Sequence, residues 1–170
     1  MHLAYVSLDG RGATDALLTA AVARLRDQRI TLAGTVQTNP PCAGRTKCDM
    51  DIHVLPDGPT LRISQDLGAH ARGCRLDSSA LETAVAEAAR RLDGAAALVV
   101  NKFGKQEAEG RGFVPVIAAA LDREIPVLVG VNALNLQPFN DFAGDLATRL
   151  PPDPDAIAAW VLESIAVHAA

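Results

Sequence analysis

The alternation of apolar and polar positions divides the chain into strands and helices that follow one another. Short apolar runs predict buried strands, at residues 3–7, 32–36, 95–100 and 126–131. Apolar residues at helical spacing predict amphipathic helices, at residues 15–28, 79–94, 113–122 and 153–168. We expect Thr14 to cap the first of these helices, and Ser79 with Glu82 to form a capping box on the second. This order predicts an α/β fold of three layers, α/β/α, with a mainly parallel sheet.

One segment departs from that alternation. Residues 51–55 and 60–64 are short extended runs joined by the breaker-rich turn Pro-Asp-Gly-Pro, which predicts an antiparallel hairpin at one edge of the sheet. Residues 37–49 have no periodicity and predict a long loop.

Composition narrows the class of protein. The chain has 170 residues, of which 49% are hydrophobic, so we expect a single domain, 1–170, with a substantial core. Its formal net charge is −4 and it has no basic block, which argues against nucleic acid as a partner. No apolar stretch is long enough to span a bilayer and no signal peptide is evident, so we expect a cytoplasmic protein with no membrane partner.

Candidate chemistry begins directly after the predicted strand 95–100. Residues 101–112 read N-K-F-G-K-Q-E-A-E-G-R-G, which combines charges with glycines. Ligands of open α/β sheets bind outside the carboxyl ends of the strands, and glycines let the backbone approach a ligand closely. We therefore expect the binding crevice at this segment.

The turn after the first strand lies where a phosphate-binding loop of the form G-x-x-x-x-G-K-[ST] would lie. Gly12 and Thr14 agree with that pattern, but Ser7 replaces its first glycine and Ala13 replaces its lysine. A helix N-terminus with free amides can still bind an oxyanion without the lysine. The match predicts a degraded phosphate loop.

The second loop also departs from the nucleotide-binding pattern. In P-loop nucleoside triphosphatases an apolar strand ends in an acidic residue that holds or orients Mg²⁺, whereas this strand ends in Asn101. The stretch from Asn101 through Gly104 to Glu107 resembles the D-E-I-G-x-x-E of small bacterial and archaeal nucleoside triphosphatases. Because asparagine supplies no anionic ligand, Mg²⁺ is a doubtful cofactor. A guanine-reading N-K-x-D motif is excluded, since position 104 is glycine.

Two further motifs extend the resemblance. Residues 48–50 read C-D-M, and residues 65–77 fit Q-D-L-G-x-x-A-x-G-C-R-L-D. Together with residues 101–112, they resemble a bacterial family of unknown function that is related to the small P-loop nucleoside triphosphatases. That family is often connected with molybdenum uptake, so the resemblance implies a link to molybdate handling.

These comparisons lead to a nucleotide- or oxyanion-binding protein with weak or absent hydrolysis, which we favour over an active triphosphatase that uses a non-standard site. We expect Glu107 and Lys102 to be the catalytic candidates, with Glu107 orienting a water, a metal ion or a partner side chain. The residues expected to contact the nucleotide or anion are Arg11, Gly12, Ala13, Thr14, Asn101, Lys102, Gly104, Lys105, Gln65, Asp66 and Arg75.

Two other classes stay open. Cys42, Cys48 and Cys74, with His53 or His70, could form a metal or redox site, in which Cys48 and Cys74 are the metal-ligand candidates. Their spacing contains no C-x-x-C pair, and an odd number of cysteines favours reduced thiols. The other class is a scaffold that reuses a nucleotide-binding fold, with a homo-oligomer as one form of partner.

Overall fold

A computed structural model describes residues 2–40, 49–65 and 75–169. Its sheet has seven strands in the order β4-β3-β2-β5-β6-β1-β7. The strands are β1 Leu3–Val6, β2 Leu32–Thr38, β3 Asp51–Leu55, β4 Thr60–Arg62, β5 Ala97–Phe103, β6 Val127–Val131 and β7 Ala147–Arg149. Strands β2, β5, β6, β1 and β7 pair in parallel, and β3 and β4 extend the sheet antiparallel at one edge. The predicted mainly parallel sheet with an edge hairpin is confirmed.

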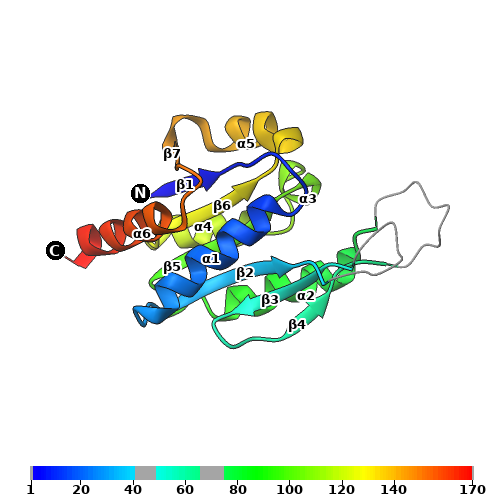
Figure 1. The fold of residues 1–170 in the computed structure, drawn as a ribbon, viewed down its shortest axis with the longest axis horizontal. Coiled ribbons are helices and arrows are strands. Elements are labelled where there is room, and N and C mark those ends of the chain that lie inside the picture. Colours follow the sequence, from blue (N-terminus) through cyan, green and yellow to red (C-terminus); the bar gives the residue numbers. More distant parts are fainter. Residues whose placement is uncertain (1, 41–48, 66–74, 170) are drawn as a thin grey trace.

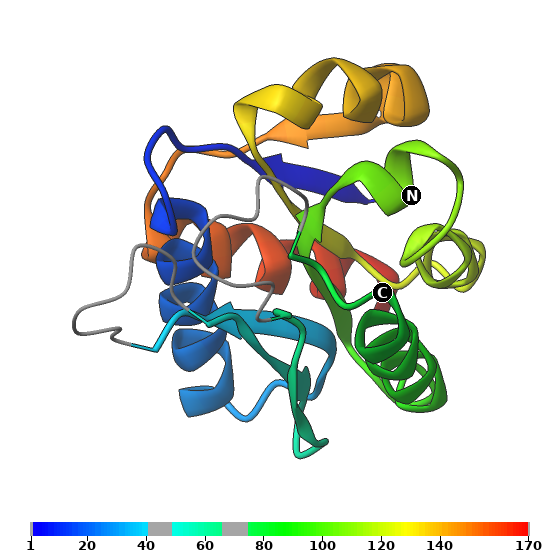
Figure 2. The ribbon, with the colours of Figure 1, turned by 90° about the vertical axis from the view of Figure 1, so that its right-hand side faces the viewer.

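Helices cover both faces of this sheet. They are α1 Ala13–Asp27, α2 Ser78–Arg90, α3 Lys105–Ala108, α4 Val114–Asp122, α5 Leu136–Ala143 and α6 Pro154–Ala169. Helices α1 and α6 lie against one face, and α2 and α4 lie against the other (Figures 1 and 2). The sheet thus separates two apolar cores, as a three-layer fold requires.

The central strands are buried on both faces, which is why they read as continuous apolar runs. Two glycines permit close approaches there. A Cβ at Gly34 in β2 would lie 1.8 Å from the carbonyl oxygen of Val99, and one at Gly130 in β6 would lie 2.2 Å from that of Asn101. Both strands can therefore pack tightly against β5 near the carboxyl edge of the sheet.

Several boundaries differ from the sequence-based prediction. Strand β5 continues through Phe103, so Asn101 and Lys102 belong to the strand and not to a loop. Helix α1 begins after Gly12, and Asp77 caps α2, where we expected Thr14 and Ser79. Helix α3, helix α5 and strand β7 were not predicted, because short elements lack enough periodic positions to stand out.

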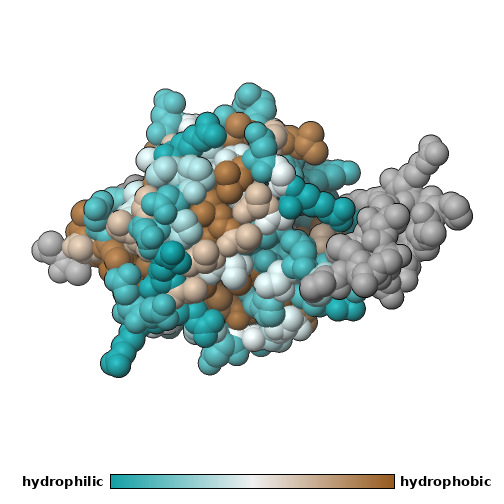
Figure 3. Space-filling view, in the orientation of Figure 1, coloured by the Kyte–Doolittle hydropathy of each residue, from teal (hydrophilic) through white to brown (hydrophobic). Residues whose placement is uncertain are grey.

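In the part of the chain that the structure describes, no helix is both long enough and apolar enough to cross a bilayer. The face that carries α1 and α6 mixes hydrophilic residues with small hydrophobic areas (Figure 3). The cytoplasmic location stays a prediction.

Candidate functional site

The carboxyl ends of β1, β2, β5 and β6 meet at a cavity of about 240 Å³, here called the anion cavity. It is lined by five of the residues that the sequence indicated, which are Arg11, Gly12, Thr14, Asn101 and Lys102. It also contains residues that the sequence analysis missed, among them Asp15, Gln37, Asn39 and Asn132. The cavity lies where ligands of α/β sheets bind.

The turn between β1 and α1 forms one wall of the anion cavity. Gly10 and Gly12 have φ angles of 99° and 76°, a left-handed conformation that favours glycine. Thr14 accepts a hydrogen bond at 3.3 Å from the backbone N–H of Leu8, which ties the turn to the first residues of the helix. Among the described residues, no side chain caps the N-terminus of α1. Gly12 and Thr14 at this end of the helix line the anion cavity, so the positive end of the helix dipole faces it.

Asn101 is almost fully buried at the end of β5, and both atoms of its amide are used. Its Oδ1 accepts from the backbone N–H of Gln37 at 2.8 Å, and its Nδ2 donates to Oδ1 of Asp15 at 2.9 Å. A backbone N–H can only donate and an ionised carboxylate can only accept, so the two neighbours fix the orientation of the amide. Asparagine satisfies both neighbours, whereas an ionised aspartate would satisfy one.

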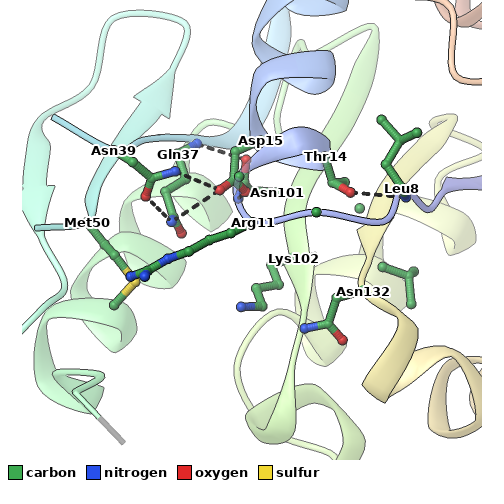
Figure 4. A pocket seen from close by; sticks show the side chains of 14 residues that line it. Leu8, Arg11, Thr14, Asp15, Gln37, Asn39, Met50, Asn101, Lys102 and Asn132 are labelled. Atoms are coloured by element: carbon green, nitrogen blue, oxygen red, sulfur yellow. Dashed lines mark hydrogen bonds between the residues drawn. The ribbon is translucent and has the colours of Figure 1, made fainter. Parts of the chain in front are cut away.

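Asp15 is the centre of this polar network (Figure 4). Its Oδ2 accepts from Nδ2 of Asn39 at 2.9 Å and from Nε2 of Gln37 at 3.4 Å, in addition to the bond from Asn101 at Oδ1. Three neutral amides thus surround the carboxylate. They come from β2, β5 and the residue after β2, so the network links α1 to the middle of the sheet.

The residues present do not fit the Mg²⁺ ion that the P-loop fold implies. The position of the phosphate-loop lysine is held by Ala13, and the position of the acidic ligand is held by Asn101. The Asn101 oxygen and both Asp15 oxygens already accept hydrogen bonds, and the Thr14 hydroxyl accepts one from Leu8. Asp15 is the one anionic group among these oxygens, and the cations of Arg11 and Lys102 border the same cavity, so this donor set suits a hard divalent cation poorly.

Two cationic side chains border the anion cavity. Arg11 extends across it toward Met50, and Lys102 approaches it from β5, with the amide of Asn132 beside it (Figure 4). Both side chains are exposed and line the anion cavity. The charge-supplying role expected of Lys102 stays a prediction.

Glu107 is buried and hydrogen-bonded to the backbone on both sides of α3. It is 4% exposed, its Oε2 accepts from the backbone N–H of Gly104 at 2.9 Å, and its Oε1 accepts from that of Phe113 at 3.0 Å. A Cβ on Gly112 would lie 2.1 Å from Oε1. The carboxylate therefore fastens α3 to the start of α4, and the catalytic role stays a prediction.

The other indicated residues are distributed around that site. Gly104, Lys105, Glu107 and Arg75 line a neighbouring cavity instead, and Lys105 lies 3.8 Å from the Glu109 carboxylate in an exposed ion pair. Ala13 is the first residue of α1 and does not line either cavity. Gln65 does not line them either, and its backbone carbonyl accepts a hydrogen bond from Nε of Arg75 at 2.9 Å.

Most of the candidate metal ligands lie outside the described residues. Cys42, Cys48, His70 and Cys74 are outside them, as is Asp66. Within the described ranges, no group of three His, Cys, Asp or Glu side chains is placed to hold a metal ion. His53 instead contacts Thr38 and Thr60 on the edge strands, at 3.0 and 2.6 Å.

The residues that the sequence analysis missed share a simple signal. Gln37 lies near the end of β2 and Asn132 directly follows β6, so both are polar residues at carboxyl ends of parallel strands. Asp15 is next to Thr14 in the first turn of α1. Asn39 directly follows β2 as well, so attention to every polar residue at a strand end would have found Gln37, Asn39 and Asn132, but not Asp15.

The sheet order and the turn between β1 and α1 define a fold of the P-loop nucleoside triphosphatase class. THEP1 from Aquifex aeolicus superimposes with a TM-score of 0.65 at 12% identity, covering 98% of each chain. A human cancer-related nucleoside triphosphatase superimposes with a TM-score of 0.55 at 15% identity, covering 100% of this chain and 99% of the other. At such low identity, the likeness establishes the fold alone.

Within that class, the chain belongs to the family described as "Protein of unknown function (DUF2478)", whose model matches residues 3–160. It is also 34% identical over 130 residues to the molybdenum import ATP-binding protein ModC 2 of Bradyrhizobium diazoefficiens. That match covers 76% of this chain but 14% of the longer protein. The predicted family resemblance is thereby confirmed.

Proposed function

We propose that this protein binds the phosphate group of a nucleotide, or another oxyanion, in the anion cavity, and that it hydrolyses nucleoside triphosphates weakly or not at all. The observation that carries this proposal is the pair Asn101 and Lys102 at the end of β5. A buried neutral amide and a cation stand there, in a strand that in triphosphatases ends in acidic residues.

Three features support binding. The uncapped N-terminus of α1 faces the cavity and attracts negative charge. Arg11 and Lys102 add two positive charges at its border. The negative charge of Asp15 lies in the same cavity, but the amides of Asn39, Gln37 and Asn101 surround it and reduce its repulsion of a ligand.

The same residues argue against efficient hydrolysis. In the D-E-I-G-x-x-E pattern, the first two of the three acidic residues correspond to Asn101 and Lys102, and the third to Glu107. Phosphoryl transfer needs charge neutralisation on the phosphates and an oriented water molecule. Without an acidic metal ligand, and with a lysine where the pattern has glutamate, neither requirement is met by the usual groups. Glu107 accepts hydrogen bonds from two backbone amides, which gives it a structural task in this segment.

The link to molybdate handling rests on the relative from Bradyrhizobium diazoefficiens. The segment that matches is a small part of that molybdenum import ATP-binding protein. We propose that this segment contributes to import by binding the oxyanion. Molybdate is a tetrahedral oxyanion, as phosphate is, and the anion cavity offers the donors and charges that either would use.

Calorimetric titration of the purified protein with phosphate, molybdate, tungstate, ATP and GTP tests the proposal, together with a phosphate-release assay in Mg²⁺. We expect an oxyanion to bind and no measurable turnover. Lys102→Ala and Arg11→Ala should each weaken binding about tenfold, because each removes one charge-assisted contact worth roughly 1.4 kcal/mol. Arg26→Ala, at the far end of α1, is the matched control and should leave affinity unchanged.

The outcomes separate the parts of the proposal. ATP or GTP turnover that Glu107→Gln abolishes would establish the active triphosphatase instead. Binding of phosphate without molybdate would remove the molybdate link and keep anion binding. No binding of any of these ligands would favour the scaffold hypothesis.

A further inference from the structure

A second cavity, of about 400 Å³, lies beside the anion cavity on the side of the sheet that α2 covers, and is here called the apolar cavity. Its walls come from Ile52 and Ile63 near the edge hairpin, Leu76 and Leu81 around the start of α2, and Phe113 before α4. Its volume falls within the range of small-molecule sites, about 300–1,000 Å³. Such walls suit an organic ring and offer little to an inorganic ion.

Thr35 lines this cavity and provides an independent observation. Its side chain, on β2, is fully buried, and among the described residues its hydroxyl has no hydrogen-bond partner. A buried polar group without a partner is uncommon, because the hydroxyl gives up its hydrogen bonds to water and gains nothing. A ligand that supplies a donor or an acceptor would account for it.

The two cavities share part of their lining. Gln37, Met50, Asn101, Lys102 and Asn132 border both. Lys102 is therefore able to contact a group in either cavity. Lys105 and Arg75 also line the apolar cavity, where Lys105 lies near the Glu109 carboxylate and Arg75 near that of Asp49. One molecule with a ring at one end and an oxyanion at the other would match the apolar walls, the buried hydroxyl and the cations together.

We propose that the natural ligand is a ring compound that carries a phosphate or a similar oxyanion, with its ring in the apolar cavity against Thr35 and its oxyanion in the anion cavity. This inference rests on the proposed function and narrows the ligand class, since an inorganic oxyanion would leave the larger cavity unfilled. Thr35, Leu81 and Lys102 become the residues that determine specificity.

Calorimetry with AMP, GMP and inorganic phosphate as probes tests the inference. We expect AMP or GMP to bind at least tenfold more tightly than phosphate. Leu81→Phe places a larger side chain in the apolar cavity and should weaken nucleotide binding at least tenfold while phosphate affinity is unchanged. Leu17→Phe is the matched control, because Leu17 is buried to the same degree but packs on the opposite face of the sheet.

Thr35→Val provides a second variant of nearly identical shape. It should weaken nucleotide binding about fivefold and leave phosphate binding unchanged, whereas Thr83→Val, on the exposed side of α2, should change neither affinity. Phosphate binding with no additional affinity for the nucleotides, or nucleotide affinity that neither cavity variant alters, would overturn the inference and leave the proposed function standing. If the wild-type protein binds none of the probes and no molybdate, the proposed function fails as well.

Discussion

Asn101 illustrates how one residue determines the chemistry of the anion cavity. Its amide lies between a backbone donor on β2 and the carboxylate of Asp15, and it is 2% exposed. An acidic residue at this position would have to accept from one neighbour and repel the other. The two buried hydrogen bonds of Asn101 therefore favour an amide over a carboxylate at this position.

Asn101→Asp should consequently destabilise the protein at neutral pH. Two carboxylates would then lie about 3 Å apart, and their repulsion should raise the pKa of one of them above its unfolded value. The folded state then binds the extra proton more tightly than the unfolded state, so stability is retained at low pH and lost as the pH rises through the raised pKa. Thermal unfolding at pH 5 and pH 8 measures this, with an expected loss of ~1–3 kcal/mol at the higher pH.

The double variant Asn101→Asp with Asp15→Asn is the control, because it returns one amide and one carboxylate to the pair. It should recover most of the lost stability. Equal stability of the single variant at both pH values would contradict the proposed network, and strong rescue of the single variant by Mg²⁺ would mean that the site can hold the metal after all.

Thr35→Val should stabilise the ligand-free protein. The hydroxyl is buried without a partner, so replacing it with a methyl group removes an unfavourable desolvation term of ~1 kcal/mol. For a chain of this size, that corresponds to an increase in melting temperature of about 2–4 °C. Circular dichroism melts of Thr35→Val and of the exposed control Thr83→Val measure the difference. A melting temperature below that of the wild type would indicate that the hydroxyl has a structural partner.

At the scale of elements, the glycine- and charge-rich segment 101–112 divides into three parts with different tasks. The first part completes strand β5, the second forms the short helix α3, and the third is the turn that leads to α4. Such a short helix is marginal on its own, so side-chain contacts must hold it in place. The Glu107 carboxylate does so through Gly104 on one side and Phe113 on the other.

Glu107→Ala should therefore lower stability by ~2–4 kcal/mol, since the buried N–H of Phe113 and the partly buried N–H of Gly104 would lose a charged acceptor. Glu109→Ala is the matched control in the same segment, because Glu109 is exposed and its partners Arg111 and Lys105 are also exposed. Its effect should stay within about 0.5 kcal/mol. Denaturant unfolding measures both. An unchanged midpoint for Glu107→Ala would show that the carboxylate is free for a role in catalysis.

The strands and long helices could be predicted because burial on both faces leaves a continuous apolar run, and burial on one stripe of a helix leaves a periodic pattern. Ala97 to Val100 is an apolar run that carries this information directly. The pattern ends at Asn101, so the last three residues of β5 looked like a loop, although their backbone continues the strand. Helix α5, Leu136–Ala143, is too short for its apolar positions to show a helical period. Of its two phenylalanines, Phe139 packs in the core and Phe142 is 40% exposed.

The candidate site was only partly predictable for a related reason. Motif comparison located Arg11, Gly12, Thr14, Asn101 and Lys102, because each belongs to one of two loops with known counterparts. Asp15, Gln37 and Thr35 depend on contacts between distant segments. The hydrogen bond between Asn101 and Asp15 joins residues 86 positions apart, and local pattern does not encode such a pair.

At the scale of the whole molecule, the chain has the sheet of a P-loop fold, while the residues at its β1–α1 turn and at the end of β5 depart from the usual pattern. Helix α1 connects the turn to the core through Leu17, Leu18 and Val22, so the anion cavity rests on a rigid support. A ligand that binds the folded state alone stabilises the entire domain through that support. In an ordinary P-loop protein, such stabilisation by a nucleotide would depend on Mg²⁺.

Here we expect the ligand to stabilise the protein without Mg²⁺. At a free concentration one hundred times its dissociation constant, a ligand contributes about 2.7 kcal/mol, which corresponds to an increase of roughly 5–11 °C in melting temperature. Because Asn101 supplies no charge and Asp15 is occupied by amides, that increase should be the same in EDTA and in Mg²⁺. Melts with AMP, phosphate and molybdate under both conditions measure it, and Lys102→Ala should reduce the increase in each. An increase that appears only with Mg²⁺ would show that the metal still completes the site, which the packing of Asn101 against Asp15 argues against.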